Sequence, residues 1–276
     1  MTKVLITGAE GSLGSRLMPS LENKGCKAFA LPFTPVTKDI EFLKTQNIEN
    51  IVHCIAILGK GDETADDVIE GNINIMAKII ALAKELKIKR FYYTNTADDK
   101  SVSAYALAKY HALEWLKLLW DGPVFNFRIM PLYNPASVTQ RQFVETVIHK
   151  CIENIDIPLT SCIQRVDFTH IDDCADAITA VVSQSQNIEG RFFDTIEIGT
   201  GNAPVVADVA EFIKARTNSK SRLLYGAIPR KPQDPDILVA DISKLLNSYS
   251  FKARYGWQEG IKQFIDRVVK TSSLKR

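Results

Sequence analysis

The chain has 276 residues and a mass of 30.8 kDa, and its 34 basic and 32 acidic residues leave a formal net charge of +2. Because the charges are balanced and dispersed, no basic stripe predicts nucleic-acid binding, and no apolar run reaches the roughly 20 residues that span a bilayer. With 46% hydrophobic residues, the chain can form one large domain or two unequal lobes. It opens directly on a strand pattern without a charged leader, so we expect a cytoplasmic protein.

The elements alternate between strand and helix patterns, as is typical of a parallel sheet with helices on both faces. Apolar runs predict strands at 28–31, 51–58, 88–94 and 124–129, and helical spacing predicts helices at 39–45, 72–86 and 103–119, followed by helices near 142–153, 207–215 and 259–269. We therefore expect an α/β fold, a Rossmann-like doubly wound parallel sheet with a smaller C-terminal α/β substrate lobe. Residues 1–130 would form the dinucleotide-binding domain and 131–276 mainly the substrate lobe, with segments near 165–198 returning to the first domain.

A glycine-rich turn follows the first strand pattern. Gly8, Gly11 and Gly14 are spaced so that the first permits a tight turn, the second a close approach of the pyrophosphate, and the third close packing of helix on strand. Free N–H groups and the helix dipole would then hold the phosphates. The alternative is an ordinary turn between a strand and a helix. We assign five residues of this turn to dinucleotide binding: Gly8, Gly11, Ser12, Leu13 and Gly14.

A second motif is the pair Tyr105 and Lys109, which lie four residues apart on a predicted helix and so share one face. An ammonium near a phenol favours the phenolate, and an oxidised nicotinamide adds positive charge, so we expect the pKa of Tyr105 to be lowered. Tyr105 would then accept a proton from an alcohol or donate one to a ketone. Lys109 would also hold the nicotinamide ribose. Such a pair can also arise by chance on any helix.

These motifs resemble the extended short-chain dehydrogenase/reductase superfamily, in particular its NAD-dependent epimerase/dehydratase group, which acts on sugar nucleotides. The matching segments are TGAEGSLG at 7–14, HCIA at 53–56, Asn72, YALAK at 105–109, DFTHIDDCADA at 167–177, IGTG at 198–201 and PRKPQDPDILVADISK at 229–244. The resemblance covers almost the whole chain. It implies a cofactor, NAD or NADP, and a nucleotide-sugar substrate. His53 and His170 fall in framework positions of this group, and the five cysteines lack ligand spacing, so we expect no metal site.

The resemblance also implies further site residues. A hydroxyl at the end of the strand before Tyr105 would hold the substrate oxygen, and Thr96 is the first choice with Thr94 next, unless the hydroxyl merely caps the strand. Asp39 and Ile40 match a segment that contacts adenine. Two arginines, Arg165 and Arg230, match positions that bind the substrate diphosphate. A solvated role for Arg165 is equally open. Asp172 and Asp173 are expected to cap a helix that begins near Cys174.

Departures from the group narrow the function. Ala97 follows Thr96 where dehydratases have two acidic residues, the loop from Ala97 to Ala104 is short, and Pro131 replaces an Asn that contacts the diphosphate. An acid that would select NAD is absent from LPFTP at 31–35, and Lys38 could reach a 2′-phosphate.

Because the acidic pair of the dehydratases is missing, we expect reduction or epimerisation at C4 of a nucleotide-linked sugar. The alternative is a non-catalytic dinucleotide sensor or scaffold. A homodimer could form through the helices near 72–87 and 103–119.

Overall fold

One six-stranded parallel sheet organises the N-terminal part of the protein. The computed structural model describes residues 1–32, 37–135 and 142–273. The strand order is β10-β5-β4-β3-β1-β2, so the order reverses between β1 and β3, where open α/β sheets bind their ligands. The strands are β1 (Lys3–Thr7), β2 (Lys27–Leu31), β3 (Asn50–His53), β4 (Arg90–Thr96), β5 (Val124–Ile129) and β10 (Phe193–Ile198).

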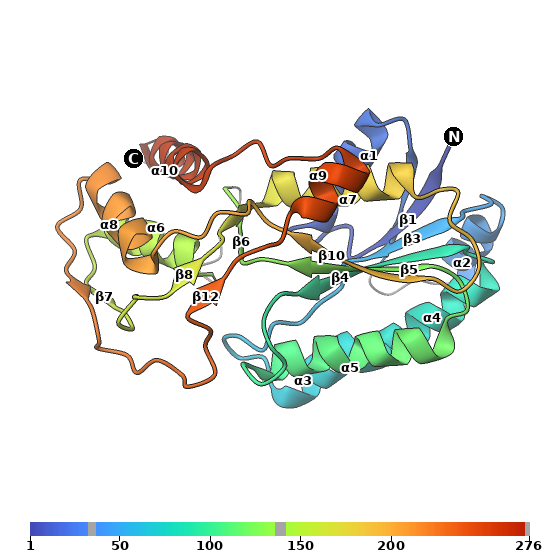
Figure 1. Ribbon diagram of the computed structural model, residues 1–276, viewed down its shortest axis with the longest axis horizontal. Coiled ribbons are helices and arrows are strands. Elements are labelled where there is room, and N and C mark those ends of the chain that lie inside the picture. Colours follow the sequence, from blue (N-terminus) through green and yellow to red (C-terminus); the bar gives the residue numbers. More distant parts are fainter. Residues whose placement is uncertain (33–36, 136–141, 274–276) are drawn as a thin grey trace.

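Helices cover both faces of this sheet (Figure 1), as the alternating pattern predicted. On one face lie α1 (Gly14–Asn23), α7 (Ile171–Gln184) and α9 (Ser243–Tyr249), and on the other lie α2 (Thr37–Lys44), α4 (Ile75–Glu85) and α5 (Ala104–Leu119). Each face has its own buried apolar cluster, centred on residues such as Leu17 and Val181 on the first face and Ile80 and Leu116 on the second. Both faces of the sheet are therefore withdrawn from water.

The predicted strand at 51–58 is too long, because β3 ends at His53 and the chain then leaves the sheet. The helical segment that follows also begins earlier than the predicted residue 72, as α3 (Ala65–Ile69), a π-helical turn η1 (Glu70–Asn74) and α4. The side chain of Asn72 donates to the carbonyl oxygens of Ile57 and Val68, both at 2.8 Å. A buried amide thus ties the loop after β3 to a wide helical turn, of a kind often found near functional sites.

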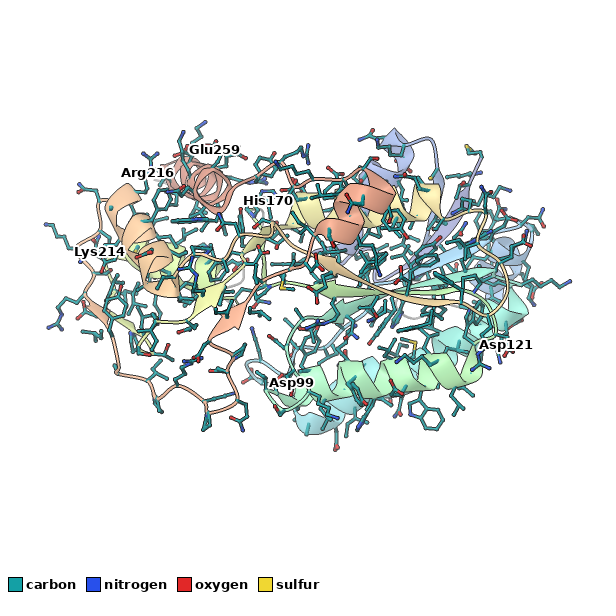
Figure 2. The ribbon with its side chains drawn as sticks, in the orientation of Figure 1. Asp99, Asp121, His170, Lys214, Arg216 and Glu259 are labelled. Atoms are coloured by element: carbon teal, nitrogen blue, oxygen red, sulfur yellow. The ribbon has the colours of Figure 1, made fainter. Side chains whose placement is uncertain are left out.

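Helix α5 and strand β5 follow the sequence pattern closely. The side chain of Ser103 accepts a hydrogen bond from the backbone N–H of Ala106 at 3.1 Å, so it caps α5 as predicted. Strand β5 spans the predicted residues 124–129. In Figure 2 the labelled residues Asp99 and Asp121 lie just before and just after this long helix. The cap fixes where α5 begins, and thereby the place of Tyr105 in its first turn.

A second lobe packs around its own apolar cluster, formed largely by α6 (Phe143–Glu153), α8 (Val206–Arg216) and α10 (Trp257–Ser273). Its strands form three parallel pairs: β6 (Leu132–Tyr133) with β9 (Thr169–His170), β7 (Ile157–Pro158) with β11 (Leu223–Leu224), and β8 (Arg165–Val166) with β12 (Ile237–Leu238). The chain passes twice from this lobe to the sheet, once through α7 and β10 and again through α9. These crossings place the second lobe beside the carboxyl ends of the strands.

Candidate active site

The glycine turn connects β1 to α1 with little room for side chains. Gly8 adopts a φ of +69°, and a Cβ at Gly14 would lie 2.1 Å from the carbonyl oxygen of Gly8. The backbone N–H groups of Ser12 and Leu13 have no hydrogen-bond partner within the described residues. The first turn of α1 contains no acidic residue. Two free donors at a helix N-terminus form a site that fits a phosphate, so these residues fit the pyrophosphate of a dinucleotide.

The carboxyl end of β4 and the first turns of α5 bring the predicted proton-transfer residues into one region. Thr96 is the last residue of β4, Tyr105 lies in the first turn of α5, and Lys109 lies one turn further along. The side chain of Lys109 is 1% exposed, and its Nζ lies 4.3 Å from the centre of the Tyr93 ring on β4. This contact with an aromatic face holds the ammonium against the sheet.

Lys109 lies in an apolar environment. Burial lowers the pKa of its ammonium to about 7, and burial also raises the pKa of the nearby Cys54 thiol to about 12. His53 is buried as well, which lowers its pKa to about 3, and its Nδ1 lies 2.7 Å from the hydroxyl of Thr7. His53 is therefore neutral and joins β3 to β1. Lys109 is the one group of this buried set that can carry a positive charge near neutral pH.

The pKa of Tyr105 departs from the expectation. Burial raises it, and the nearby carboxylate of Asp98 raises it further, since a second negative charge disfavours the phenolate. The predicted lowering by Lys109 is not seen in the protein alone. The main cause is the burial of the phenol, and Lys109 does not offset it because its Nζ is directed to the ring of Tyr93. The phenol is therefore held in its protonated form.

The two candidate hydroxyls differ in their surroundings. Thr94 is buried and donates to the carbonyl oxygen of His53 at 2.8 Å, so its hydroxyl joins β4 to β3. Thr96 is partly exposed, and its Oγ1 accepts from the backbone N–H of Asp98 at 3.1 Å. The geometry favours Thr96 over Thr94 as the hydroxyl that is accessible to a substrate.

The arginines predicted to bind a diphosphate both lie next to Asp236, at the joint between the two lobes. Arg230 is paired with the Asp236 carboxylate at 2.7 Å and also donates to the carbonyl oxygen of Asp234 at 2.8 Å. The side chain of Arg165 is exposed, and its backbone N–H donates to the carbonyl oxygen of Asp236 at 2.8 Å. The fold thus brings the backbone of Arg165 and the side chain of Arg230 to the same residue, although they are 65 residues apart in the sequence. In this state Arg230 is neutralised by its own loop.

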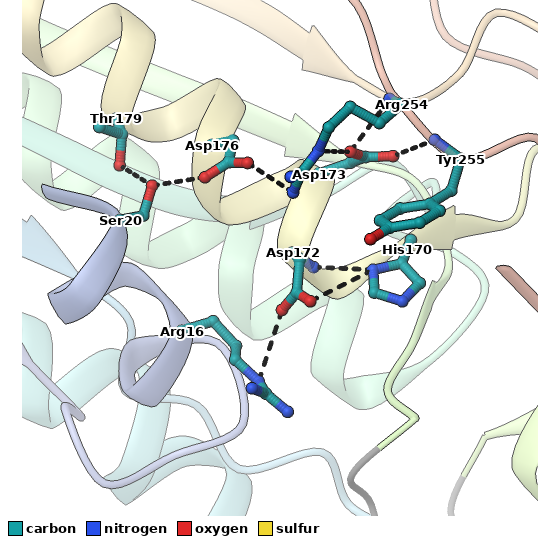
Figure 3. Close-up of polar contacts among 9 residues, drawn as sticks. All are labelled: Arg16, Ser20, His170, Asp172, Asp173, Asp176, Thr179, Arg254 and Tyr255. Carbon is teal, nitrogen blue, oxygen red and sulfur yellow. Dashed lines mark hydrogen bonds and ion pairs between the residues drawn. The ribbon is translucent and has the colours of Figure 1, made fainter. Parts of the chain in front are cut away.

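The acidic segment before α7 has a structural role, although a different one from that predicted. Helix α7 begins at Ile171 and is capped by His170, whose Nδ1 accepts from the backbone N–H of Asp172 at 3.1 Å. Figure 3 shows the side chain of Asp173 accepting from Arg254 and Tyr255, and Asp172 paired with Arg16 at 3.5 Å. The predicted caps at Asp172 and Asp173 are therefore wrong. These carboxylates join α7 to α1 and to the C-terminal segment.

The adenine-contact residues and the cofactor-selecting positions lie at the start of α2. Asp39 and Ile40 lie in the first turns of this helix and are partly exposed. Lys38 is exposed beside them. Residues 33–36, which include most of the segment where an acid would select NAD, lie outside the described residues. Within the described residues, no group of three His, Cys, Asp or Glu side chains could hold a metal ion, and no helix is long and apolar enough to span a bilayer.

Three residues near the site were not found from the sequence: Lys60, Asp98 and Glu145. Asp98 follows Ala97 in the loop after β4, a position that carries no signal of its own, yet its charge acts on Tyr105. Glu145 does carry a signal in the sequence. It lies three positions before Ile148 on the buried face of α6, where an apolar residue is expected. Lys60 carries no signal, because a lysine in a polar loop is ordinary.

Comparison with known proteins identifies the family. The model of the NAD dependent epimerase/dehydratase family matches residues 4–199, so the chain belongs to this NAD(P)-dependent family of sugar-nucleotide epimerases and reductases, as the motifs predicted. CDP-abequose synthase from Salmonella muenchen is 27% identical over 95% of this chain and 97% of its own length. A dTDP-L-rhamnose 4-epimerase from Burkholderia thailandensis is 28% identical over 56% of this chain and 42% of its own length.

Solved structures share the fold along the full chain. MoeE5 in complex with UDP-glucose and NAD superposes with a TM-score of 0.81 at 20% identity, covering 98% of this chain and 99% of its own. The UDP-glucose 4-epimerase of Thermotoga maritima, with UDP-glucose, gives a TM-score of 0.80 at 15% identity, covering 98% of this chain and all of its own. At these identities the likeness shows the fold, which is the predicted Rossmann-like sheet with a smaller second lobe.

Proposed function

We propose that the protein reduces or epimerises C4 of a nucleotide-linked sugar, with Tyr105 as the acid or base. The observation that carries this proposal is the arrangement of Thr96, Tyr105 and Lys109 at the carboxyl edge of the sheet. The same sheet carries a glycine turn with two free N–H donors. Bound NAD(P)H or NAD(P)⁺ would supply or accept the hydride. Thr96 holds the substrate oxygen, Tyr105 transfers the proton, and Lys109 binds the ribose and balances the charge on the phenol.

The protonated phenol of Tyr105 suits the reduction of a ketone. Burial and Asp98 raise its pKa, so in the protein alone the phenol keeps its proton, as a free tyrosine does near neutral pH. A ketone that receives a hydride needs such a proton donor. We propose a 4-keto nucleotide sugar as the substrate.

The nucleotide is proposed to be CDP. The support is the match to CDP-abequose synthase, which extends over nearly the whole of both chains. Arg165 and Arg230 are proposed to bind the diphosphate, since guanidinium groups suit phosphate oxygens. Binding would then require Arg230 to exchange the carboxylate of Asp236 for the ligand. The exposed Lys38 on α2 favours NADP over NAD.

An assay over a substrate panel tests this function. Purified protein with NADPH or NADH would be offered 4-keto and ordinary hexoses linked to CDP, UDP and dTDP, while the nicotinamide absorbance is followed. The products would be analysed for inversion at C4, because epimerisation leaves the absorbance unchanged. We expect oxidation of the reduced cofactor with a 4-keto CDP-sugar. Tight cofactor binding without turnover of any sugar would favour the sensor instead.

We also propose a homodimer formed through the outer face of α5, next to α4. This face exposes four large apolar or aromatic side chains, which together are unusual for solvated surface: Leu107 at 41%, Tyr110 at 40%, Trp115 at 48% and Leu118 at 68%. Trp115 and Leu118 also line a shallow hollow of about 180 Å³. A second copy of the same helix pair offers a matching apolar face, as a two-fold interface requires.

The double substitution Trp115→Glu with Leu118→Glu is expected to make the protein monomeric, because two charges on each partner would be buried against apolar surface. Light scattering coupled to gel filtration would measure the mass. Ile163→Glu, at a site that is also 68% exposed but lies in the second lobe, is the control and should leave the mass unchanged. A wild-type protein that is monomeric at micromolar concentration contradicts the proposed dimer.

A further inference from the structure

Helix α6 carries a buried carboxyl group with one unpaired oxygen. Glu145 is 2% exposed, and its Oε1 accepts from the backbone N–H of Asn134 at 3.0 Å. Its Oε2 has no hydrogen-bond partner in the described structure. Buried polar groups in native proteins are nearly always bonded, and a carboxylate oxygen without a donor is costly. Among the described residues, which stop at 135 and resume at 142, Oε2 therefore lacks the donor that its burial calls for.

The surroundings of Glu145 make a purely structural role a poor explanation. Its neighbours on the buried face of α6 are apolar, namely Val144, Val147 and Ile148, and burial raises the pKa of the carboxyl group. An apolar residue there would fill the same space without this cost. Against the burial, hydrogen bonds from the backbone N–H groups of Asn134 and of Glu145 itself lower the pKa of the carboxyl group, and the positive charge of Lys60 lowers it further. The fold thus provides partial compensation for the charged form.

Lys60 relates Glu145 to the catalytic region. It lies in the loop after β3, and its Nζ donates to the side-chain oxygen of Gln142, at the N-terminus of α6, at 2.9 Å. Its charge acts on both Glu145 and Asp98, and Asp98 in turn acts on Tyr105. The carboxyl group of Glu145 thus belongs to the second lobe but faces the same edge of the sheet as the proton-transfer residues.

The chain around Glu145 supports this placement. Strand β6 follows directly on the carboxyl end of β5 and leads to Asn134, whose N–H holds Oε1. That hydrogen bond fixes the carboxyl group at the end of the sheet where ligands bind in this class of fold. Its unpaired oxygen has almost no exposed surface in this state, so a ligand bound between the lobes would reach it by displacing a neighbouring side chain.

We propose that Oε2 of Glu145 accepts a hydrogen bond from a hydroxyl group of the substrate sugar and so helps to orient the ring toward Tyr105. The assignment rests on the proposed function. A carboxylate offers only acceptors, which suits a sugar hydroxyl and repels the diphosphate. In this arrangement the positive side chains of Arg165 and Arg230 bind the diphosphate, and the carboxylate of Glu145 binds the sugar.

The substitution Glu145→Gln tests the assignment, because it keeps the shape and one oxygen for Asn134 but removes the charge. Calorimetry with CDP-glucose and with CDP, both in the presence of cofactor, would separate the sugar from the nucleotide. We expect CDP-glucose to bind about tenfold more weakly, the scale of a hydrogen bond to a charged group, and CDP to bind unchanged. Glu153→Gln, an exposed acid at the end of α6, is the matched control.

A series of CDP-glucose analogues, each lacking one hydroxyl, gives an independent test in wild-type protein. One position should lose about tenfold in affinity, and that loss should vanish in Glu145→Gln. The series still decides the question if the variant does not fold. Equal affinities across the series would overturn the role of Glu145 but not the proposed function. A folded Glu145→Gln protein that binds CDP-glucose like wild type would do the same. Wild-type protein that binds neither CDP-glucose nor CDP contradicts the proposed function as well.

Discussion

The substitution Tyr105→Phe is expected to lower kcat by at least about a hundredfold, the usual scale of general acid catalysis, while leaving cofactor affinity unchanged. It removes one oxygen and keeps the ring, so the packing of α5 against β4 is retained. The measurement is single-turnover and steady-state kinetics on the nucleotide sugar found in the substrate panel, with cofactor affinity measured by calorimetry.

Two further variants serve as controls for the effect of Tyr105→Phe on kcat. Tyr110→Phe removes the same atom from a tyrosine on the outer face of the same helix, keeps the aromatic ring of the proposed dimer face, and should keep full activity. Lys109→Met should lower both cofactor affinity and turnover, because Lys109 is assigned to ribose binding and to charge balance at the phenol. A Tyr105→Phe enzyme with wild-type kcat would remove Tyr105 from proton transfer.

The substitution Gly11→Val is expected to abolish dinucleotide binding in a protein that still folds. A Cβ at this position would meet only the carbonyl oxygen of Gly8, at 3.1 Å, and Gly11 does not adopt a positive φ. The rest of the valine side chain would take up space at the turn that carries the free N–H groups of Ser12 and Leu13, where the pyrophosphate is expected to bind. Calorimetry with NADH and NADPH, together with circular dichroism, would measure binding and fold in one sample.

Controls distinguish a lost binding site from a damaged fold. Gly256→Val introduces the same side chain where a Cβ meets nothing within 4 Å, and it should bind the cofactor normally. Gly14→Val places the Cβ 2.1 Å from the Gly8 carbonyl oxygen and should destabilise the protein itself. Undiminished dinucleotide binding by a folded Gly11→Val protein would show that the pyrophosphate binds elsewhere.

The features that could be predicted from the sequence are those set by local geometry. The glycine spacing predicted the turn between β1 and α1, Ser103 predicted the start of α5, and the proline after Gly122 preceded β5 as expected. Each depends on residues within a few positions of one another. The apolar run from Ile51 to Leu58 misled the prediction, because the carboxyl end of β3 continues into a partly buried loop that is also apolar.

What could not be predicted depends on groups that meet only in the folded chain. The pKa of Tyr105 was expected to be lowered by its helical neighbour Lys109, but burial raises it, and Asp98 in the loop after β4 raises it further. Asp173 was expected to cap a helix, but it binds the backbone N–H groups of Arg254 and Tyr255, about 80 residues away. Spacing along one helix cannot reveal such partners.

The most direct test of the central claim is the transfer of a labelled hydride. NADPH or NADH carrying two deuterium atoms at C4 of the nicotinamide, so that either hydrogen is labelled, would be incubated with the protein and a 4-keto CDP-sugar, and the product would be examined by mass spectrometry and NMR. We expect deuterium at C4 of the sugar with wild-type protein, and at least about a hundredfold slower labelling with Tyr105→Phe. A product without deuterium, or labelling that is equally fast without Tyr105, would contradict the assignment of this protein as a reductase that uses Tyr105.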